Sequence, residues 1–396
     1  MELLLKNARV VDSSQDFLGD VYIKFGIIQE LGSSLNKDCK TIDAKGLVLM
    51  PSFVDLHAHF RDPGQVYKED IYSGSLAAVS GGYTSVNLMA NTIPICNSME
   101  EVKYVLDKSQ AINLIDIHQS VSITKDLMGE DISHLDKLDN KVKMISDDGR
   151  GVSNSKVMLD AMIKAKEKGI TVISHAENEE LTSVDTRLAE NTMTWRDITL
   201  SKFTGCNLHI AHVSTKEAVK YIIEAKKEGN KVTCEVTPHH LMLTSKEGYK
   251  VNPPLRENED INALINAIKE GYVDAIATDH APHSFEDKLN GANGISGIET
   301  SFSVCFTKLV DEGHITLKKL SEIMSKNPAK LMKLNKGEIK IGYEGDLVLL
   351  DLDRKYKVNS KNFNSKGKNS PFNGKELKGI IISTIKAGRV VYNNEN

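Results

Sequence analysis

The middle of the chain alternates short apolar runs with longer segments in which apolar residues recur at helical spacing. Eight runs are predicted to be β-strands: Phe53–His57, Ser85–Met89, Leu114–Gln119, Val142–Ser146, Thr171–His175, Leu208–His212, Lys231–Val236 and Asp274–Thr278. Two of the intervening segments, Asn154–Lys168 and Thr215–Glu228, have helical spacing, and a glycine directly follows each. This alternation predicts an α/β fold with a parallel sheet, because parallel strands need crossover connections.

The number of strand–helix units indicates how the sheet is arranged. Eight units over about 285 residues favour a closed (β/α)₈ TIM barrel over an open sheet. An open doubly wound sheet is the alternative, but the sequence contains no glycine-rich dinucleotide-binding fingerprint that would support it.

The two ends of the chain have a different pattern, with short β-rich runs between glycine and Asn/Asp turns. The N-terminal runs are Leu3–Val11, Gly19–Lys24 and Gly26–Leu31, and the C-terminal runs are Gly345–Asp351, Gly379–Gly388 and Arg389–Tyr392. We expect these runs to pair in one small domain built from both termini. The predicted division is 1–50 with 340–396 for this domain, and 51–339 for the barrel.

Metal-ligating residue types gather at the ends of the predicted strands. The residues concerned are His57, His59, Asp147, Asp148, His175, His212, His239, His240, Asp279 and His280. The carboxyl ends of barrel strands converge on one face, where active sites of this fold lie. A His-x-His pair is a weak signal alone, but imidazoles and carboxylates that meet on one face predict a metal site.

The number of candidate ligands favours two metal ions over one. A single ion takes about three or four protein ligands, so a larger set is better explained by two ions that share a carboxylate. Asp148 is the preferred bridge and Asp147 the alternative, since strand parity alone does not choose between them.

Arg61 follows the His-x-His pair by two residues and is one of only eight arginines in the chain. Its position at the predicted mouth favours a planar fork that binds a substrate carboxylate. The alternative is an ordinary surface arginine.

Composition narrows the classes of function. With 50 basic and 54 acidic residues, the formal net charge is −4, which argues against a nucleic-acid partner. Five cysteines without paired spacing predict free thiols in a reducing compartment. No apolar run is long enough to span a bilayer, and Met1–Lys6 is too short for a signal-peptide core, so we expect a cytoplasmic protein without membrane contact.

Six linked motifs carry a resemblance to a known family. They are Asp55-Leu-His-Ala-His-Phe-Arg-Asp-Pro-Gly64, Ser146-Asp-Asp-Gly149, His209-Ile-Ala-His-Val-Ser-Thr-Lys216, Glu235-Val-Thr-Pro-His-His240, Asn252-Pro-Pro-Leu-Arg256 and Ala277-Thr-Asp-His-Ala-Pro-His283. In order and over essentially the whole chain, they resemble the class I bacterial dihydroorotases of the amidohydrolase superfamily. The terminal segments resemble the composite β-sandwich domain of that superfamily.

The resemblance implies a role for each site residue. It assigns two zinc ions per chain: one bound by His57, His59 and Asp279, the other by His175 and His212, with Asp148 as the bridge. Asp279 would also be the catalytic proton carrier. The substrate would contact His59, Arg61, Asn91, Asn252, His283, Asn293 and Gly294. Related hydantoinases bridge their metals with a carboxylated lysine, but here Lys141 and Lys143 begin the fourth strand and no lysine ends it.

The implied activity is the reversible cyclisation of N-carbamoyl-L-aspartate to L-dihydroorotate, the third step of pyrimidine biosynthesis. The alternatives are a hydantoinase, dihydropyrimidinase or allantoinase, and an inactive dihydroorotase-like partner of aspartate transcarbamoylase. We expect a homodimer and leave an association with aspartate transcarbamoylase open. The segment Ser284–Ser296, after the eighth strand, is predicted to be a lid, with a plain surface loop as the alternative.

Overall fold

The computed structural model describes residues 2–394 and contains a strand at every predicted barrel position. The eight strands are β6 (Phe53–Ala58), β7 (Tyr83–Leu88), β8 (Asp116–Gln119), β9 (Met144–Ile145), β10 (Thr171–Ser174), β11 (Leu208–Ile210), β12 (Val232–Val236) and β13 (Ala275–Ile276). Each overlaps one predicted run. The strand predictions are therefore confirmed, although β9 and β13 are shorter than expected.

Two parallel sheets close into the barrel. One has the order β6-β7-β8 and the other β13-β12-β11-β10-β9. Isolated parallel bridges join them, between Ala58 and His280 on one side and between Val121 and Ile145 on the other. Buried side chains such as Leu56, Met144 and Ile173 form one apolar cluster of the barrel strands. The closed barrel is thus confirmed over the open sheet.

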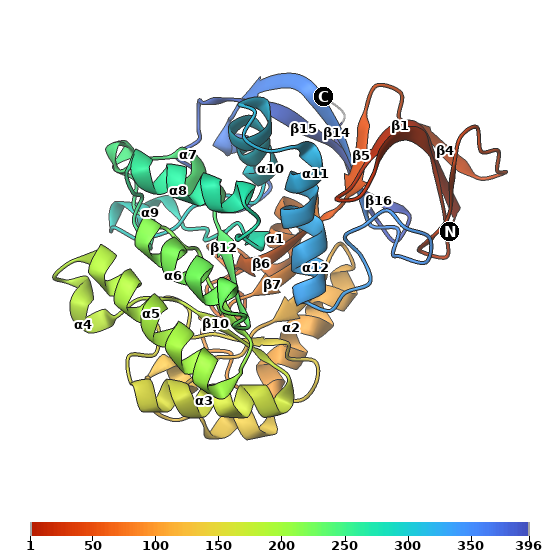
Figure 1. Cartoon of the computed structure of the whole chain (residues 1–396). Helices are drawn as coiled ribbons and strands as arrows, with labels where there is room; N and C mark the ends of the chain where they lie inside the picture. Colours follow the sequence, from red (N-terminus) through yellow and green to blue (C-terminus); the bar gives the residue numbers. More distant parts are fainter. Residues whose placement is uncertain (1, 395–396) are drawn as a thin grey trace.

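Helices cover the outside of the barrel (Figure 1). The longer ones are α1 (Ile71–Ser80), α2 (Met99–Ile112), α3 (Ser155–Lys168), α5 (Thr186–Thr204), α6 (Lys216–Lys227) and α8 (Asn258–Lys269). The shorter ones are α4 (Glu179–Thr182), α7 (Pro238–Met242), α9 (Phe285–Leu289), α10 (Ser301–Cys305), α11 (Leu317–Ser321) and α12 (Asn327–Leu331). Helix α3 begins where predicted, because the Asn154 side chain accepts hydrogen bonds from the backbone of Lys156 and Val157.

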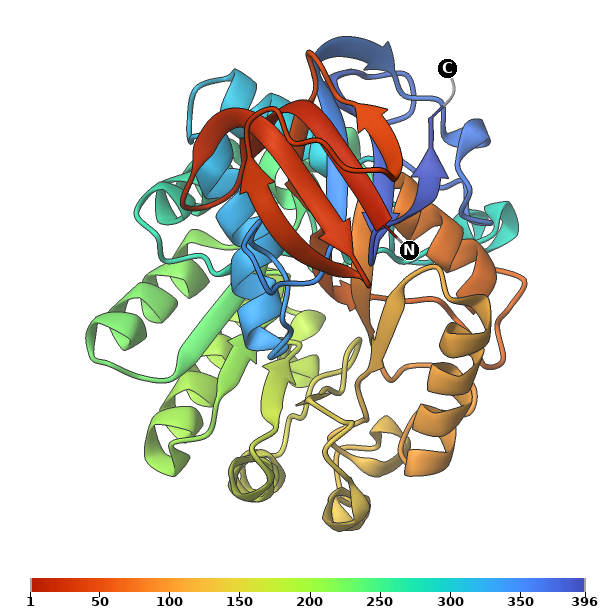
Figure 2. The ribbon, with the colours of Figure 1, turned by 90° about the vertical axis from the view of Figure 1, so that its right-hand side faces the viewer.

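The two ends of the chain share one sheet. Its strands are β1 (Glu2–Val11), β2 (Asp16–Lys24), β3 (Ile27–Gly32), β4 (Lys40–Asp43), β5 (Val48–Pro51), β14 (Leu347–Lys357), β15 (Glu376–Lys386) and β16 (Arg389–Asn393). Antiparallel pairing of β5 with β14 joins the two termini, and Figure 2 shows their strands side by side above the barrel.

This terminal sheet surrounds an apolar core of its own, which includes Leu5, Val21, Leu49, Leu347 and Ile385. The predicted β-sandwich built from both termini is confirmed. The exact division at 50/51 and 339/340 stays a prediction.

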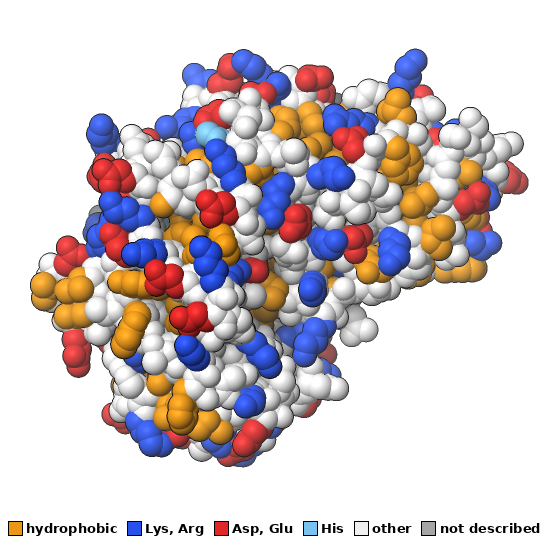
Figure 3. Space-filling model, in the orientation of Figure 1, with side chains coloured by type: hydrophobic (Ala, Val, Ile, Leu, Met, Phe, Trp, Pro, Cys, Tyr) orange, Lys and Arg blue, Asp and Glu red, His pale blue; other side chains and the backbone are white. Residues whose placement is uncertain are grey.

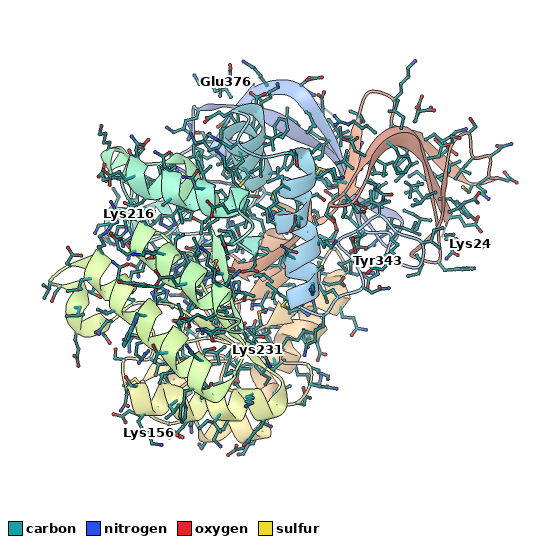
Figure 4. The ribbon with its side chains drawn as sticks, in the orientation of Figure 1. Lys24, Lys156, Lys216, Lys231, Tyr343 and Glu376 are labelled. Atoms are coloured by element: carbon teal, nitrogen blue, oxygen red, sulfur yellow. The ribbon has the colours of Figure 1, made fainter. Side chains whose placement is uncertain are left out.

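Charges of both signs are interspersed on the face shown in Figure 3. Figure 4 labels Lys156, Lys216 and Lys231 on the barrel side and Lys24 and Tyr343 on the side of the terminal sheet. All five cysteines are free, as predicted. Between residues 2 and 394, no helix combines the length and apolar character needed to cross a membrane.

Candidate metal centre and substrate pocket

The predicted ligands meet at the carboxyl ends of the barrel strands. His57 lies in β6 and His59 directly after it, while Asp148, His175, His212 and Asp279 follow β9, β10, β11 and β13. All six side chains are buried. Two of the ligands have positive φ, His212 at 31° and Asp279 at 46°, and so has Arg61 at 54°. Non-glycine residues in this region are strained, and such strain is typical of functional sites.

Asp148 lies at the centre of the cluster. Its Oδ1 is 3.1 Å from His57 Nε2, 3.3 Å from His175 Nδ1 and 3.7 Å from His212 Nε2. Its Oδ2 is 3.5 Å from His59 Nε2. One carboxylate thus contacts all four predicted imidazole ligands.

Asp279 faces the same space from the opposite strand. Its Oδ1 is 3.2 Å from His59 Nε2 and 3.7 Å from His57 Nε2. The ligand atoms of His57, His59 and Asp279 all lie within 4.8 Å of one another, as do those of His57, Asp148 and His212. His175 Nδ1 is 2.9 Å from His212 Nε2 and so borders the second group.

Asp147, the alternative to Asp148, is oriented away from this space. Its carboxylate accepts hydrogen bonds from the backbone N–H of Ile123 (2.7 Å) and Thr124 (3.0 Å) and from the Thr124 hydroxyl. Burial raises its pKa to about 6. Asp147 therefore fixes the loop after β8 and contacts none of the imidazoles.

Two glutamates that the sequence analysis did not identify orient the histidines from behind. Glu235 in β12 contacts His57 Nδ1 at 2.8 Å and His209 Nε2 at 3.0 Å. Glu177 contacts His175 Nε2 at 2.8 Å. A carboxylate on the second nitrogen fixes the tautomer and orientation of a metal-binding histidine. An acidic residue inside the apolar run of β12 was a usable signal for Glu235, but Glu177 had none.

The charges in this cluster are strongly coupled. Burial alone would raise the pKa of Asp148, but the surrounding imidazoles, chiefly His57, hold that pKa well below its usual range. Burial opposes protonation of His175, yet Asp148 and Glu177 raise its pKa to about 9. The pKa of Glu235 falls to about 2 despite burial, because His209 and His57 contact its carboxylate.

The cluster contains polar atoms that protein groups leave unsatisfied. His57 Nε2, Asp148 Oδ1 and His212 Nδ1 are buried and make no hydrogen bond with any residue from 2 to 394. Buried polar atoms are normally paired, so atoms of this kind, on residues that bind metals, indicate a site for a cation. The residues therefore fit a metal centre.

A cavity of about 220 Å³ opens over the cluster. It is lined by His59, Arg61, Asn91, Asp148, Gly149, His175, His212, Asn252, Asp279, Ala281, His283, Asn293 and Gly294. Every predicted site residue except His57 lines this cavity, and His57 lies directly behind Asp148 and Asp279.

Arg61 occupies one side of the cavity. Its Nη2 lies 3.5 Å from His283 Nε2, and its Nε is buried without a hydrogen bond. Burial, with the nearby charge of Arg61, lowers the pKa of His283 to about 3. The cavity thus presents a cationic guanidinium beside a neutral imidazole.

Asn91 and Asn252, the predicted substrate-binding asparagines, also border the cavity, and their side-chain amides already form hydrogen bonds with other residues. Asn91 Oδ1 lies 2.9 Å from His59 Nδ1, and Asn91 Nδ2 donates to Asp148 Oδ2 at 3.1 Å. Asn252 Nδ2 donates to Glu177 Oε2 at 2.7 Å. Both asparagines therefore connect the cavity wall to predicted metal ligands or to the glutamate that contacts one of them.

The side chains of His239, His240 and His280 are buried nearby, but within residues 2–394 they form no hydrogen bond with a predicted metal ligand. The His280 backbone carbonyl accepts a hydrogen bond from the His59 N–H at 2.8 Å. His240 contacts Thr237 Oγ1 and the Pro253 carbonyl, and His280 accepts a hydrogen bond from the Gly297 N–H. Glu235 and Glu177, rather than the side chains of these histidines, contact His57 and His175.

Comparisons with known proteins agree with this geometry. The profile of the Amidohydrolase family matches residues 48–391. A dihydroorotase from Clostridium botulinum (strain Eklund 17B / Type B) is 54% identical over 396 residues, covering 99% of this chain and all of the relative. A second, from Ruminiclostridium cellulolyticum, is 42% identical over 423 residues, covering 99% of this chain and 98% of the relative. The chain belongs to the dihydroorotases of the amidohydrolase family.

Solved structures with the same fold include cyclic amidohydrolases of other specificity. Dihydropyrimidinase from Brevibacillus agri NCHU1002 matches with a TM-score of 0.90 at 26% identity, covering 100% of this chain and 96% of that one. L-Hydantoinase from Arthrobacter aurescens matches with a TM-score of 0.88 at 26% identity and the same coverage. The fold is thus shared across these enzymes, while full-length sequence identity distinguishes this chain as a dihydroorotase with the binuclear metal site typical of amidohydrolases.

Proposed function

We propose that this dihydroorotase interconverts N-carbamoyl-L-aspartate and L-dihydroorotate at two zinc ions per chain. The observation that carries the substrate assignment is Arg61. Its guanidinium stays charged, it borders the cavity, and no carboxylate between residues 2 and 394 forms an ion pair with it. N-carbamoyl-L-aspartate and L-dihydroorotate both carry a carboxylate that can form an ion pair with Arg61.

The proposed zinc ligands divide into two sets. His57, His59 and Asp279 would hold one ion, His175 and His212 would hold the other, and Asp148 would be shared between them. The central position of Asp148 supports the bridge, and imidazole with carboxylate is a ligand set suited to zinc. When bound, a pair of divalent ions activates a water at neutral pH and polarises a carbonyl oxygen.

Asp279 is proposed as the proton carrier. In the hydrolytic direction a water oxygen bonds to the ring amide carbon, and the bond from that carbon to the ring nitrogen breaks. Asp279 accepts the proton that the water loses and donates it to the leaving nitrogen. Cyclisation reverses these transfers and releases water. The position of Asp279 in the cavity wall, beside His59, supports this role.

The remaining cavity residues are proposed to orient the substrate. Arg61, Asn91 and His283 hold its carboxylate, and Asn252 with Asn293 and Gly294 borders the ring. His59 borders the same space and is proposed to contact substrate as well as metal. Substrates without a carboxylate, such as hydantoin or dihydrouracil, would leave Arg61 unpaired, which favours dihydroorotate over them.

One assay tests the proposed specificity. Purified protein is mixed separately with dihydroorotate, hydantoin, dihydrouracil and allantoin, and ring opening is followed. We expect turnover of dihydroorotate alone. Turnover of another ring with equal or greater kcat/KM would contradict the proposal, and absence of all turnover in metal-loaded protein would favour an inactive scaffold.

A homodimer, an association with aspartate transcarbamoylase and a cytoplasmic location are proposed with this function. Light scattering of the purified chain, alone and mixed with the transcarbamoylase, measures both assemblies. A monomer at micromolar concentration would contradict the homodimer.

A further inference from the structure

The segment 358–375, between β14 and β15, leaves the terminal sheet and lies over the mouth of the barrel. The backbone N–H of Ser365 donates to Glu299 Oε1 at 3.0 Å, and that of Lys366 donates to Glu69 Oε1 at 3.1 Å. Glu69 follows β6 and Glu299 follows β13. The C-terminal part of the chain is thus attached to the loops that carry the site.

Asn369 is the residue of this segment that reaches the substrate cavity wall. Its Oδ1 accepts hydrogen bonds from the His283 N–H at 3.0 Å and from Ser296 Oγ at 2.8 Å. Its Nδ2 donates to the Gly294 carbonyl at 3.0 Å, and its own carbonyl accepts from the Ser296 N–H at 2.8 Å. One side chain therefore connects both ends of the segment after β13.

The two residues that Asn369 joins are packed tightly against each other. Gly294 has φ +134°, and a Cβ there would lie 2.6 Å from the Ala281 carbonyl oxygen and 3.2 Å from His283 Cδ2. The Lys288 ammonium also donates to the Gly294 carbonyl, at 3.1 Å. Because the two residues are in close contact, a displacement of one would displace the other. Asn369 hydrogen-bonds to both, to the His283 N–H and to the Gly294 carbonyl.

We propose that Asn369 is a positioning residue for substrate binding. It does not line the cavity itself. It holds His283, on the carboxylate side of the cavity, at a fixed distance from Gly294, on the ring side. The inference rests on the proposed function, because it takes His283 and Gly294 as substrate contacts. The C-terminal segment thereby contributes to the affinity of a site whose chemistry lies wholly in the barrel.

The test is Asn369→Leu, which keeps nearly the same volume and removes the hydrogen bonds of the amide. We expect KM to rise about tenfold for dihydroorotate and for N-carbamoyl-L-aspartate, as for the loss of hydrogen bonds from a preorganised contact. We expect kcat to stay within about threefold, because Asp279 and the metal ligands are untouched. Metal content should equal that of the wild type.

Asn373→Leu is the matched control. Asn373 lies on the same segment, and its Oδ1 also accepts two hydrogen bonds, from the Ser360 N–H (3.0 Å) and hydroxyl (3.3 Å), but away from the cavity. We expect it to leave KM unchanged. Asn369→Ser, with a shorter polar side chain, replaces the leucine variant if the latter does not fold, and should raise KM by a smaller factor.

Three results overturn the inference: a folded Asn369 variant with wild-type KM, an equal rise of KM in Asn373→Leu, or a loss confined to kcat. The proposed function is tested separately by the wild type. If the wild type does not turn over dihydroorotate, that proposal fails, whatever the variants show.

Discussion

Two groups of acidic and metal-binding residues lie at opposite ends of the barrel, and they differ in how their charge is neutralised. At the amino ends of the strands, Asp116, Glu344 and Asp346 come within 4.8 Å of one another, as metal ligands would. The buried ammonium of Lys336 lies among them, 2.8, 2.8 and 2.7 Å from their oxygens, and donates to Ser85 Oγ as well. That cluster supplies its own cation.

At the mouth, by contrast, the ion pairs that Asp148 and Asp279 form within residues 2–394 are all with histidines and none is with a lysine or arginine. Within residues 2–394, His57 Nε2, Asp148 Oδ1 and His212 Nδ1 make no hydrogen bond, and Arg61 makes no ion pair. The comparison shows that proximity of carboxylates is a poor criterion for a metal site. Unsatisfied buried ligand atoms, with carboxylates on the far side of the histidines, are the better criterion.

The largest effect expected at the mouth is that of Asp279→Asn. Asparagine keeps the size of the side chain and a carbonyl oxygen for the metal but cannot accept the proton. Turnover should fall by about 10²–10⁴, typical of losing a general acid–base group, while zinc content and substrate binding change little. Steady-state kinetics with metal analysis measures both. Turnover within about tenfold of wild type would show that another group, such as His283, carries the proton.

Arg61→Ala is expected to have the next largest effect. Removing the partner of a buried substrate carboxylate should cost about 2–5 kcal/mol in kcat/KM, with zinc content unchanged. Arg61→Lys should recover only part, since a point charge does not reproduce the bidentate fork. Unchanged kcat/KM in the alanine variant would show that Arg61 does not bind substrate.

At the opposite end, Lys336→Met should affect stability and leave turnover intact. It removes the cation shared by the three carboxylates, of which Asp116 keeps an ion pair with Lys386 at 2.8 Å. We expect a loss of about 2–4 kcal/mol in unfolding free energy, less than for a fully buried pair because Asp116 and Glu344 are partly exposed. Chemical denaturation measures this. A fall in kcat with unchanged stability would contradict the separation of the two ends.

The ion pair between Lys336 and Asp116 also predicts that the stability of the protein depends on pH. Burial would raise the pKa of Asp116, but Lys336 and Lys386 lower it. A carboxylate with a lowered folded-state pKa contributes stability above its unfolded pKa, and this contribution is lost as the pH falls through the folded value. The wild type should therefore lose more stability than Lys336→Met on acidification below about pH 4. Parallel stability curves for the two proteins would contradict this.

The smallest effect is expected from Glu235→Gln, which weakens the orientation of His57 without removing a ligand. Loss of a carboxylate behind a metal-binding histidine typically lowers metal affinity by about 10–100-fold. Zinc competition with a chelator measures it. An unchanged zinc affinity would show that burial alone fixes His57.

The sequence alone predicted those features of the structure that depend on residues close together in the chain. Apolar runs located all eight barrel strands, and the Asn154 cap located the start of α3. The mouth residues followed because strand ends in a barrel must converge. Strands β9 and β13 are shorter than predicted, and after β13 the positive φ of Asp279 shows that the chain is no longer extended at the ligand.

Several pairings within the site could not be predicted because the two partners are distant in sequence. Glu235 meets His57 across 178 positions, and Asn369 meets His283 across 86. Neither Glu177 nor Lys336 has a local pattern that distinguishes it from an exposed charge. Such contacts depend on the tertiary arrangement of the loops, which periodicity and spacing do not encode.

The most direct test of this account is the metal content of wild type, Asp148→Asn and Asp346→Asn, each loaded with zinc and dialysed without added bicarbonate. If the mouth holds two ions bridged by Asp148, and the opposite cluster is neutralised by Lys336 and Lys386 without a metal ion, the wild type and Asp346→Asn should each retain two zinc ions per chain, and Asp148→Asn fewer. Equal zinc in Asp148→Asn and wild type, or loss of zinc in Asp346→Asn, would contradict it.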